Sequence, residues 1–251
     1  RTSGRSRPAS RVRRVSRASA DADREHEASP STPGPVPALW HYLRAHRQDF
    51  SDRDSAVLSS VFTTLKVFLE GVDAEGLCVG PEDVRRLGRG GIGYQEVYSD
   101  PEMTLCIFLL RAGAVIPMHD HPHMYVFGRL LFGRMRVVSF DVEPLEEGHG
   151  SLLGRLRSLD TLGPVPVTYG LGPEEGNVHQ LQALDDVAFF DVVTPSYDRR
   201  KQRDCTYFSC RARDDGEGGG YLLTPANPRN FCTEVVPYRG PPFSPRRPFV
   251  Y

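Results

Sequence analysis

The segment GAVIPMHDHP, residues 113–122, carries the most informative pattern in this chain of 251 residues. In an extended strand, residues i and i+2 point to the same side. His119 and His121 can therefore direct both imidazoles to one point while Asp120 faces away. A later segment, GNVH at residues 176–179, places a third histidine, His179, on another predicted strand. Three imidazoles from two strands predict a metal site inside a barrel.

Short β-strands are predicted throughout the region around this segment. From about residue 94 the chain alternates between runs rich in Val, Ile, Phe, Tyr and Thr and breaks of Gly, Pro and Asp. The predicted strands are 94–98, 104–111, 124–131, 135–141, 165–169, 178–184, 187–193, 205–211, 220–223 and 232–236. Nothing repeats at a fixed period, and no long helices separate the strands. The pattern therefore favours a mainly β barrel or sandwich over a parallel, doubly wound sheet.

Two helices are predicted before the strands, at residues 38–48 and 52–70. Ser51 and Asp54 have the spacing of a capping box at the start of the second helix. Its apolar residues recur at helical spacing, namely Val57, Leu58, Val61, Phe62, Leu65, Phe68 and Leu69. We expect this stripe to pack against the outside of the barrel.

Composition excludes several classes of function. Hydrophobic residues make up 39% of the chain, and basic residues are scattered, which argues against a nucleic-acid partner. Apolar runs such as Leu105 to Leu110 are far shorter than a membrane span, so we expect no membrane association. The five cysteines are widely spaced, and no hydrophobic secretory segment precedes them. A reducing compartment, cytoplasmic or nuclear, is predicted.

The N-terminal region has a different composition. Residues 1–37 are rich in Arg, Ser, Ala and Pro, which predicts disorder. The first 20 residues contain seven Arg and no acidic residue, as in an organelle transit segment; a solvated basic tail is the alternative. We therefore predict a tail at 1–37, one domain at 38–245 and a C-terminal tail at 246–251.

The two histidine segments resemble the two motifs of the cupins. The first is a Gly followed by His-x-His, with Gly133 twelve residues beyond the second His, and the second is the core Gly-x2-His. The glutamate ligand of many cupins would fall at Val126, which cannot bind a metal. The resemblance implies a cupin double-stranded β-helix, or jelly-roll barrel, with N-terminal helices packed outside. The missing carboxylate leaves a three-histidine site and points to the thiol dioxygenases.

A closer resemblance is to the cysteamine (2-aminoethanethiol) dioxygenase and plant cysteine oxidase family. It rests on IPMHDHP at 116–122, HQ at 179–180, FDVVTPSYD at 190–198 and DCTY at 204–207, and it covers about residues 40–245 in the same order. The family implies Fe(II) as cofactor and a monomer. It also implies conversion of an aminothiol plus O2 to a sulfinic acid, with N-terminal cysteine of a peptide or protein, or cysteamine, as substrate. Oxygen sensing through N-degron degradation is implied by the resemblance alone.

The ligand set is consistent with this chemistry. Imidazole suits Fe(II), and three protein ligands leave positions open for thiolate and dioxygen. Without a carboxylate ligand, the full charge of the metal lowers the pKa of a bound thiol. The same histidines also suit Zn²⁺, so a metal-binding cupin without oxygenase activity is the alternative hypothesis.

Two residues are expected near the metal by resemblance. Asp191 would accept an imidazole N–H from a ligand or hold the substrate amine. Tyr197 would donate a hydrogen bond to bound dioxygen or thiolate. The alternatives are an aspartate in a turn and a tyrosine in the core.

A thioether between Cys205 and Tyr207 is known at a similar position in animal cysteamine dioxygenases, and both side chains are expected on one strand face. Plain packing is the alternative for this pair. We interpret Cys106, Cys210 and Cys232 as small buried apolar groups.

Three further residues are candidates for the pocket. His123 would lie at the pocket mouth if the strand alternation continued past the intervening proline. Arg129 or Arg136 would bind a substrate carboxylate only if directed inward. Because the sequence presents no clear arginine for that role, an aminothiol without a carboxylate is favoured over free cysteine.

Overall fold

The computed structural model describes residues 34–52, 55–145, 150–213 and 220–243. The predicted C-terminal tail and most of the predicted N-terminal tail, residues 1–33, lie outside this range. The first helix begins at Pro35, earlier than the domain start predicted at residue 38, with a proline at its first position. Proline suits that position because its fixed φ is helical and its missing N–H would have no partner there.

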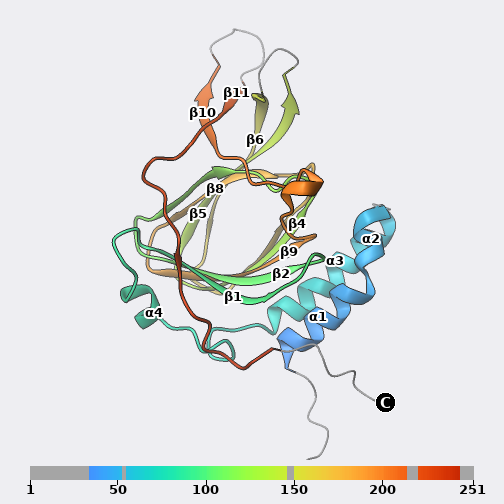
Figure 1. Cartoon of the computed structure of the whole chain (residues 1–251), viewed down its shortest axis with the longest axis vertical. Coiled ribbons are helices and arrows are strands. Elements are labelled where there is room, and N and C mark those ends of the chain that lie inside the picture. Colours follow the sequence, from blue (N-terminus) through green and yellow to red (C-terminus); the bar gives the residue numbers. More distant parts are fainter. Residues whose placement is uncertain (1–33, 53–54, 146–149, 214–219, 244–251) are drawn as a thin grey trace, which may run out of the picture. The chain divides into compact units, whose positions relative to one another are not determined.

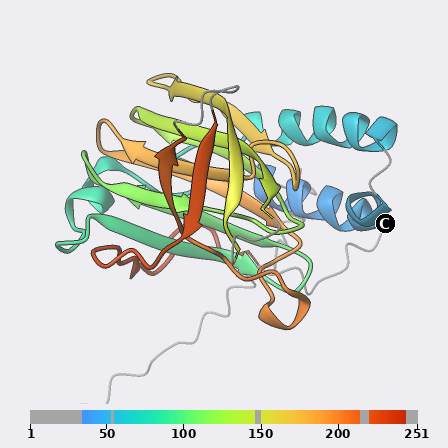
Figure 2. The ribbon, with the colours of Figure 1, turned by 90° about the horizontal axis from the view of Figure 1, so that it is seen from above.

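Two six-stranded sheets face each other and enclose a barrel (Figures 1 and 2). In the first sheet the order is β12-β1-β2-β9-β4-β7, and in the second it is β10-β11-β6-β5-β8-β3. The strands are β1 (Ile92–Ser99), β2 (Thr104–Leu110), β3 (Val115–His119), β4 (Tyr125–Phe132), β5 (Met135–Pro144), β6 (Leu152–Leu162), β7 (Thr168–Leu171), β8 (Val178–Ala183), β9 (Val187–Thr194), β10 (Phe208–Ala212), β11 (Tyr221–Pro225) and β12 (Glu234–Val235). The expected mainly β, cupin double-stranded β-helix is confirmed.

Every predicted strand in the list overlaps an observed one. The list lacks β3, which was expected only from the alternation of His119 and His121, and β6 was missed altogether. Its sequence, LLGRLRSLDTL, mixes charged with apolar residues, and most of its side chains are at least partly exposed. An outer strand of this kind shows neither a continuous apolar run nor strict alternation. It is recognised only through its pairing with β5 and β11.

The helices pack outside the first sheet, as expected (Figure 1). They are α1 (Pro35–Ala45), α2 (Arg47–Asp52), α3 (Ser55–Glu70) and the short α4 (Pro81–Arg85), which the sequence did not predict. Most of the α3 stripe packs with Leu39 of α1 and Phe127 of β4 in one cluster. Val57 is an exception, because its side chain is 41% exposed. The predicted capping box includes Asp54, which lies outside the described residues.

Strand β9 is buried on both faces and joins two cores. Phe190 packs with the helices, whereas Phe189 packs with Leu181 and Ile116 inside the barrel. Side chains alternate along a strand, so Asp191, two residues beyond Phe189, also points into the barrel. No helix within the described residues is long and apolar enough to span a membrane.

The interpretation of the cysteines was partly wrong. Cys106 is buried in β2, but Cys210 and Cys232 are both exposed. Cys210 lies in β10, where every residue after Phe208 is exposed, and Cys232 lies in the loop before β12. A single small residue carries no pattern from which its face can be predicted.

We predict that Leu65→Ala destabilises the domain by about 2–5 kcal/mol, because Leu65 is fully buried between α3 and the sheet. Val67→Ala in the same helix should change the free energy of unfolding by less than about 0.5 kcal/mol, because Val67 is 65% exposed. Chemical denaturation of both variants tests the packing. Equal effects would show that α3 does not dock as described.

Candidate metal centre

Three buried histidines converge at one point inside the barrel. One ring nitrogen from each of His119, His121 and His179 lies within 4.8 Å of the others. The distances between ring centroids are 4.9 Å for His119 and His121, 4.5 Å for His119 and His179, and 5.2 Å for His121 and His179. His119 ends β3 and pairs directly with His179 of β8. His121 lies just beyond β3, so the expectation that both histidines occupy one strand is only half right.

Each imidazole is oriented through its Nδ1 atom. The Nδ1 of His119 is 2.9 Å from the Pro117 carbonyl oxygen, and that of His179 is 3.1 Å from the Asn177 carbonyl oxygen. The Nδ1 of His121 is 2.7 Å from the Tyr197 hydroxyl. A carbonyl oxygen can only accept, so Nδ1 carries the proton in His119 and His179. This tautomer leaves the lone pair of Nε2 available for a metal.

Asn177 joins the two histidine segments, a role that sequence reasoning missed. Its side chain accepts a hydrogen bond from the His121 N–H and donates one to the His121 carbonyl, both at 2.9 Å. It also donates to the Gly172 carbonyl at 3.0 Å. Since its own carbonyl oxygen holds His179, this residue couples the positions of two candidate ligands. The signal was its place two residues before the histidine in GNVH.

Burial keeps the three imidazoles neutral. The pKa of His179 is lowered to about 3, mainly by burial and then by the nearby His119. Burial also lowers the pKa of His119, and that of His121 lies well below its usual value. Metal ligands must be deprotonated, so neutral imidazoles are ready to bind.

The donor set fits a divalent metal ion with three protein ligands. Val126, where many cupins have a glutamate, is buried with Met124, Val193 and Leu171. Three neutral nitrogens suit Fe(II) or Zn²⁺ and leave further positions for exogenous ligands. The donor set suits both metals.

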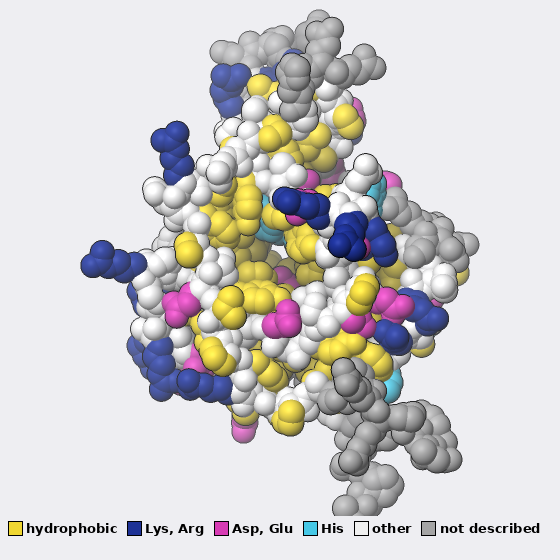
Figure 3. Space-filling model, viewed as in Figure 1, with side chains coloured by type: hydrophobic (Ala, Val, Ile, Leu, Met, Phe, Trp, Pro, Cys, Tyr) yellow, Lys and Arg dark blue, Asp and Glu magenta, His cyan; other side chains and the backbone are white. Residues whose placement is uncertain are grey.

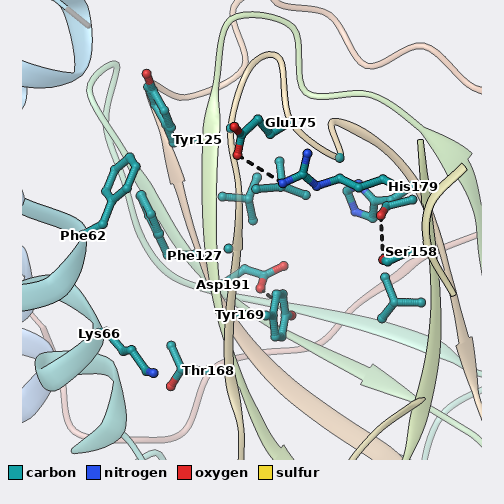
Figure 4. Close-up of a pocket in the computed structure, with 18 of the residues that line it drawn as sticks. Phe62, Lys66, Tyr125, Phe127, Ser158, Thr168, Tyr169, Glu175, His179 and Asp191 are labelled. Atoms are coloured by element: carbon teal, nitrogen blue, oxygen red, sulfur yellow. Dashed lines mark hydrogen bonds and ion pairs between the residues drawn. The ribbon is translucent and has the colours of Figure 1, made fainter. Parts of the chain in front are cut away.

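A cavity of about 970 Å³ opens beside the histidines and is lined by His179, Tyr169 and Asp191 (Figure 4). It extends to Phe62 and Lys66 of α3. Figure 3 shows the hollow on this face, with hydrophobic side chains around it. The interior of the barrel is therefore open to small molecules on the side of the candidate metal site.

Asp191 is a buried carboxylate in this cavity. Burial raises its pKa to about 7, opposed by a hydrogen bond that the Tyr169 hydroxyl donates to Oδ1 at 2.9 Å. The Nδ1 atoms of all three histidines have other partners, so the structure does not support Asp191 as their acceptor. It lies within β9 and is not in a turn. Its expected role in holding a substrate amine stays a prediction.

Tyr197 contacts a candidate ligand directly. Besides the His121 contact, its hydroxyl lies 3.1 Å from the Asp120 carbonyl oxygen, to which it can donate. The residue is 41% exposed, so it is not a core tyrosine. Its expected donation to bound dioxygen or thiolate stays a prediction; the observed contacts hold His121 in place.

Cys205 and Tyr207 do not share a strand face, contrary to expectation. Cys205 lies in a loop, and Tyr207 precedes β10 and forms an isolated bridge with His119. The Cys205 thiol lies close to both Tyr207 and Tyr197. Burial is the main reason why the pKa of this thiol is raised to about 11. The two predicted partners lie in contact, and the thioether itself stays a prediction.

The other candidates lie away from the cavity. His123 is exposed in a left-handed backbone conformation with φ 59°. Arg129 donates to the carbonyls of Glu70 and Pro166 on the helix side of the sheet, and Arg136 is exposed. Arg157, which was not predicted, does line the cavity. The Arg157 guanidinium group pairs with Asp141 and Glu175 at the rim of the cavity.

The barrel and its three-histidine centre define this protein as a metal-binding cupin. Residues 67–243 match the model of the PCO_ADO family, and the chain belongs to this family. This confirms the resemblance found in the sequence.

Curated relatives include two named enzymes. The chain is 29% identical to the 2-aminoethanethiol dioxygenase of Mus musculus over 219 residues, which cover 72% of this chain and 84% of that protein. It is 32% identical to plant cysteine oxidase 2 of Arabidopsis thaliana over 120 residues, which cover 47% of this chain and 44% of that protein. Among solved structures, KdgF from Halomonas sp. covers 46% of this chain and 88% of its own, with 18% identity and a TM-score of 0.34.

We predict that Asn177→Ala lowers metal affinity by about 10–100-fold, because the backbone at His121 loses both of its side-chain hydrogen bonds. Asn227→Ala, at an exposed loop position, is the matched control. Competition with a chromophoric chelator measures both affinities. Equal affinities in the two variants would contradict the coupling role of Asn177.

We also predict that Zn²⁺ affinity stays nearly constant as the pH falls from about 8 to 5. A histidine with an ordinary pKa of about 6.5 would compete for protons in this range. Since burial lowers the pKa of all three imidazoles, they stay neutral until lower pH. The measurement is chelator competition at each pH, corrected for the chelator's own protonation. A loss of affinity centred near 6.5 would show that these rings are solvated.

Proposed function

We propose that this chain is an Fe(II)-dependent thiol dioxygenase that converts an aminothiol and O2 to the sulfinic acid. The observation that carries the proposal is a cavity lined by the buried carboxylate of Asp191 and by His179, one of three neutral imidazoles that converge at one point. The names of the relatives support the reaction type, and the three-histidine centre supports a metal enzyme. Both oxygen atoms of O2 are added to the sulfur, and the thiol proton remains on the product.

His119, His121 and His179 would hold the ferrous ion through Nε2. The bound ion would supply the positive charge that favours a thiolate and the electrons that activate dioxygen. Asp191 would receive the ammonium group of the substrate at neutral pH, which orients the sulfur toward the histidines. Apolar side chains such as Val126 and Leu181 line the same cavity.

The shape of the cavity favours a substrate larger than cysteamine. Cavities of about 300–1,000 Å³ hold ligands of drug-like size, and this one reaches from His179 to Lys66 of α3. We propose the N-terminal cysteine of a peptide or protein as substrate, with cysteamine as the smaller alternative. Oxygen sensing through N-degron degradation is the proposed consequence, supported by the family resemblance. A cytoplasmic or nuclear location and a monomeric state stay predictions from sequence.

Mass spectrometry of a Cys-initiated peptide and of 2-aminoethanethiol, incubated in air with iron-loaded protein, tests the proposal. We expect each thiol to gain about 32 mass units, equivalent to two oxygen atoms, with the peptide reacting faster. His179→Ala should abolish the product. Gln180→Ala on the same strand should retain it, because neighbouring side chains face opposite ways.

Zinc-loaded protein separates the proposal from a metal-binding cupin without oxygenase activity. Zinc has no redox chemistry, so it should yield no product. Failure of the iron-loaded protein to oxidise either thiol would favour that alternative.

A further inference from the structure

A row of four residues crosses the first sheet at the level of Asp191. In the strand register, Cys106 of β2 pairs with Asp191 of β9, Asp191 pairs with Gly128 of β4, and Gly128 pairs with Tyr169 of β7. Directly paired residues point to the same face, so the row faces the interior of the barrel. Asp191 and Tyr169 are two strand spacings apart, about 10 Å. Tyr169 can reach Asp191 only by lying across Gly128.

The Tyr169 ring occupies the space where a side chain at position 128 would lie. A Cβ atom at Gly128 would lie 2.0 Å from Cζ, 2.2 Å from Cε2 and 2.3 Å from the hydroxyl oxygen of Tyr169. These distances are far below van der Waals contact. Gly128 is not among the glycines with positive φ, so its backbone conformation is open to other residues. The constraint at this position is the contact with the ring.

The hydrogen bond has a definite direction. Burial raises the pKa of Tyr169 well above its usual value, so its hydroxyl stays protonated and donates to Asp191 Oδ1 at 2.9 Å. The other titratable group in the row, the Cys106 thiol, is buried and also has a raised pKa. Above pH 7 the row therefore carries a single negative charge, on Asp191. Oδ1 is occupied by Tyr169, and Oδ2 remains for a ligand.

A cationic partner for this carboxylate is absent from the described residues. Lys66 lines the outer end of the same cavity, but its side chain is 62% exposed and faces Glu70. A buried carboxylate without a counter-ion is costly, and a substrate ammonium would relieve that cost. Figure 4 shows Tyr169 and Asp191 side by side between His179 and Phe127.

We infer that Tyr169 is a positioning residue that holds Asp191 for the ammonium group of an aminothiol, and that Gly128 provides the room for it. This inference rests on the proposed function and adds two residues to it. Tyr169 acts through Asp191, since its hydroxyl is occupied by that carboxylate. The pair selects substrates that carry an amine beside the thiol.

Tyr169→Phe in the iron-loaded, full-length protein tests the inference. We expect kcat/KM for 2-aminoethanethiol to fall about 10-fold or more, the scale of a hydrogen bond to a charged group, mostly through a higher KM. For 2-mercaptoethanol, which has a hydroxyl in place of the amine, kcat/KM should stay within about twofold. A general packing defect would lower both values equally, and that outcome would overturn the inference.

Gly128→Ala provides an independent variant that keeps the tyrosine but displaces its ring. Gly128→Ala should lose the preference for the amine-bearing substrate in the same way. The double variant with Tyr169→Phe should have a kcat/KM for 2-aminoethanethiol no lower than that of the more impaired single variant. Tyr221→Phe is the matched control, because its ring packs on Phe140, 5.0 Å between centroids, outside the cavity lining. Iron content and thermal unfolding of each variant show whether the fold is retained. If Gly128→Ala does not fold, Tyr169→Phe decides alone.

A measurement on metal-free protein is independent of activity. Carbon-13 NMR of labelled aspartate should show a higher pKa for Asp191 in Tyr169→Phe than in the wild-type protein. The Tyr169 hydroxyl stabilises the charged carboxylate, and the variant lacks this hydrogen bond. An unchanged pKa would overturn the inference even if the wild-type protein oxidises neither thiol. Activity without any change in the preference for the amine would overturn it while leaving the proposed function intact.

Discussion

The pairing of β3 with β8 is the constraint on which the candidate site depends. It sets His119 directly opposite His179 and brings the GNVH segment against the end of β3, where Asn177 binds the backbone of His121. Because His121 lies beyond the last residue of the strand, sheet hydrogen bonds alone do not position it. The side chain of Asn177 takes their place, and a shift in this register would separate the ligands.

The site combines groups that burial affects in opposite ways. Desolvation disfavours charge, so it makes the histidines better ligands while it raises the pKa of Asp191 to about 7. A divalent metal and a substrate ammonium would each reverse part of that cost. The proposed metal and substrate would thus bring the positive charges that the described residues do not place beside Asp191. Tyr169 would keep this carboxylate oriented between the two.

The structure shows contacts of Tyr197 and Asp191 that the sequence did not predict. Tyr197 was expected to donate to bound dioxygen or thiolate, which stays a prediction, and the structure adds a contact between its hydroxyl and the Nδ1 of His121. Asp191 was expected to serve a ligand imidazole as one alternative, but its partner is Tyr169. Both residues were found through motif resemblance, which indicates that a residue lies near a site. It does not tell which atom the residue contacts, because that depends on loops and strands distant in sequence.

The sequence alone determined the mainly β fold and the outer helices, because these follow from local periodicity, and it identified the three histidines through the two short segments that carry them. Tertiary structure alone decided that Asn177 binds the backbone of His121 and that Cys205 lies close to two tyrosines. It also decided that the Tyr169 ring lies across Gly128 to reach Asp191. The physical reason is the register between strands. Gly128, Tyr169 and Asp191 become neighbours only when three strands pair, and no local pattern specifies that pairing.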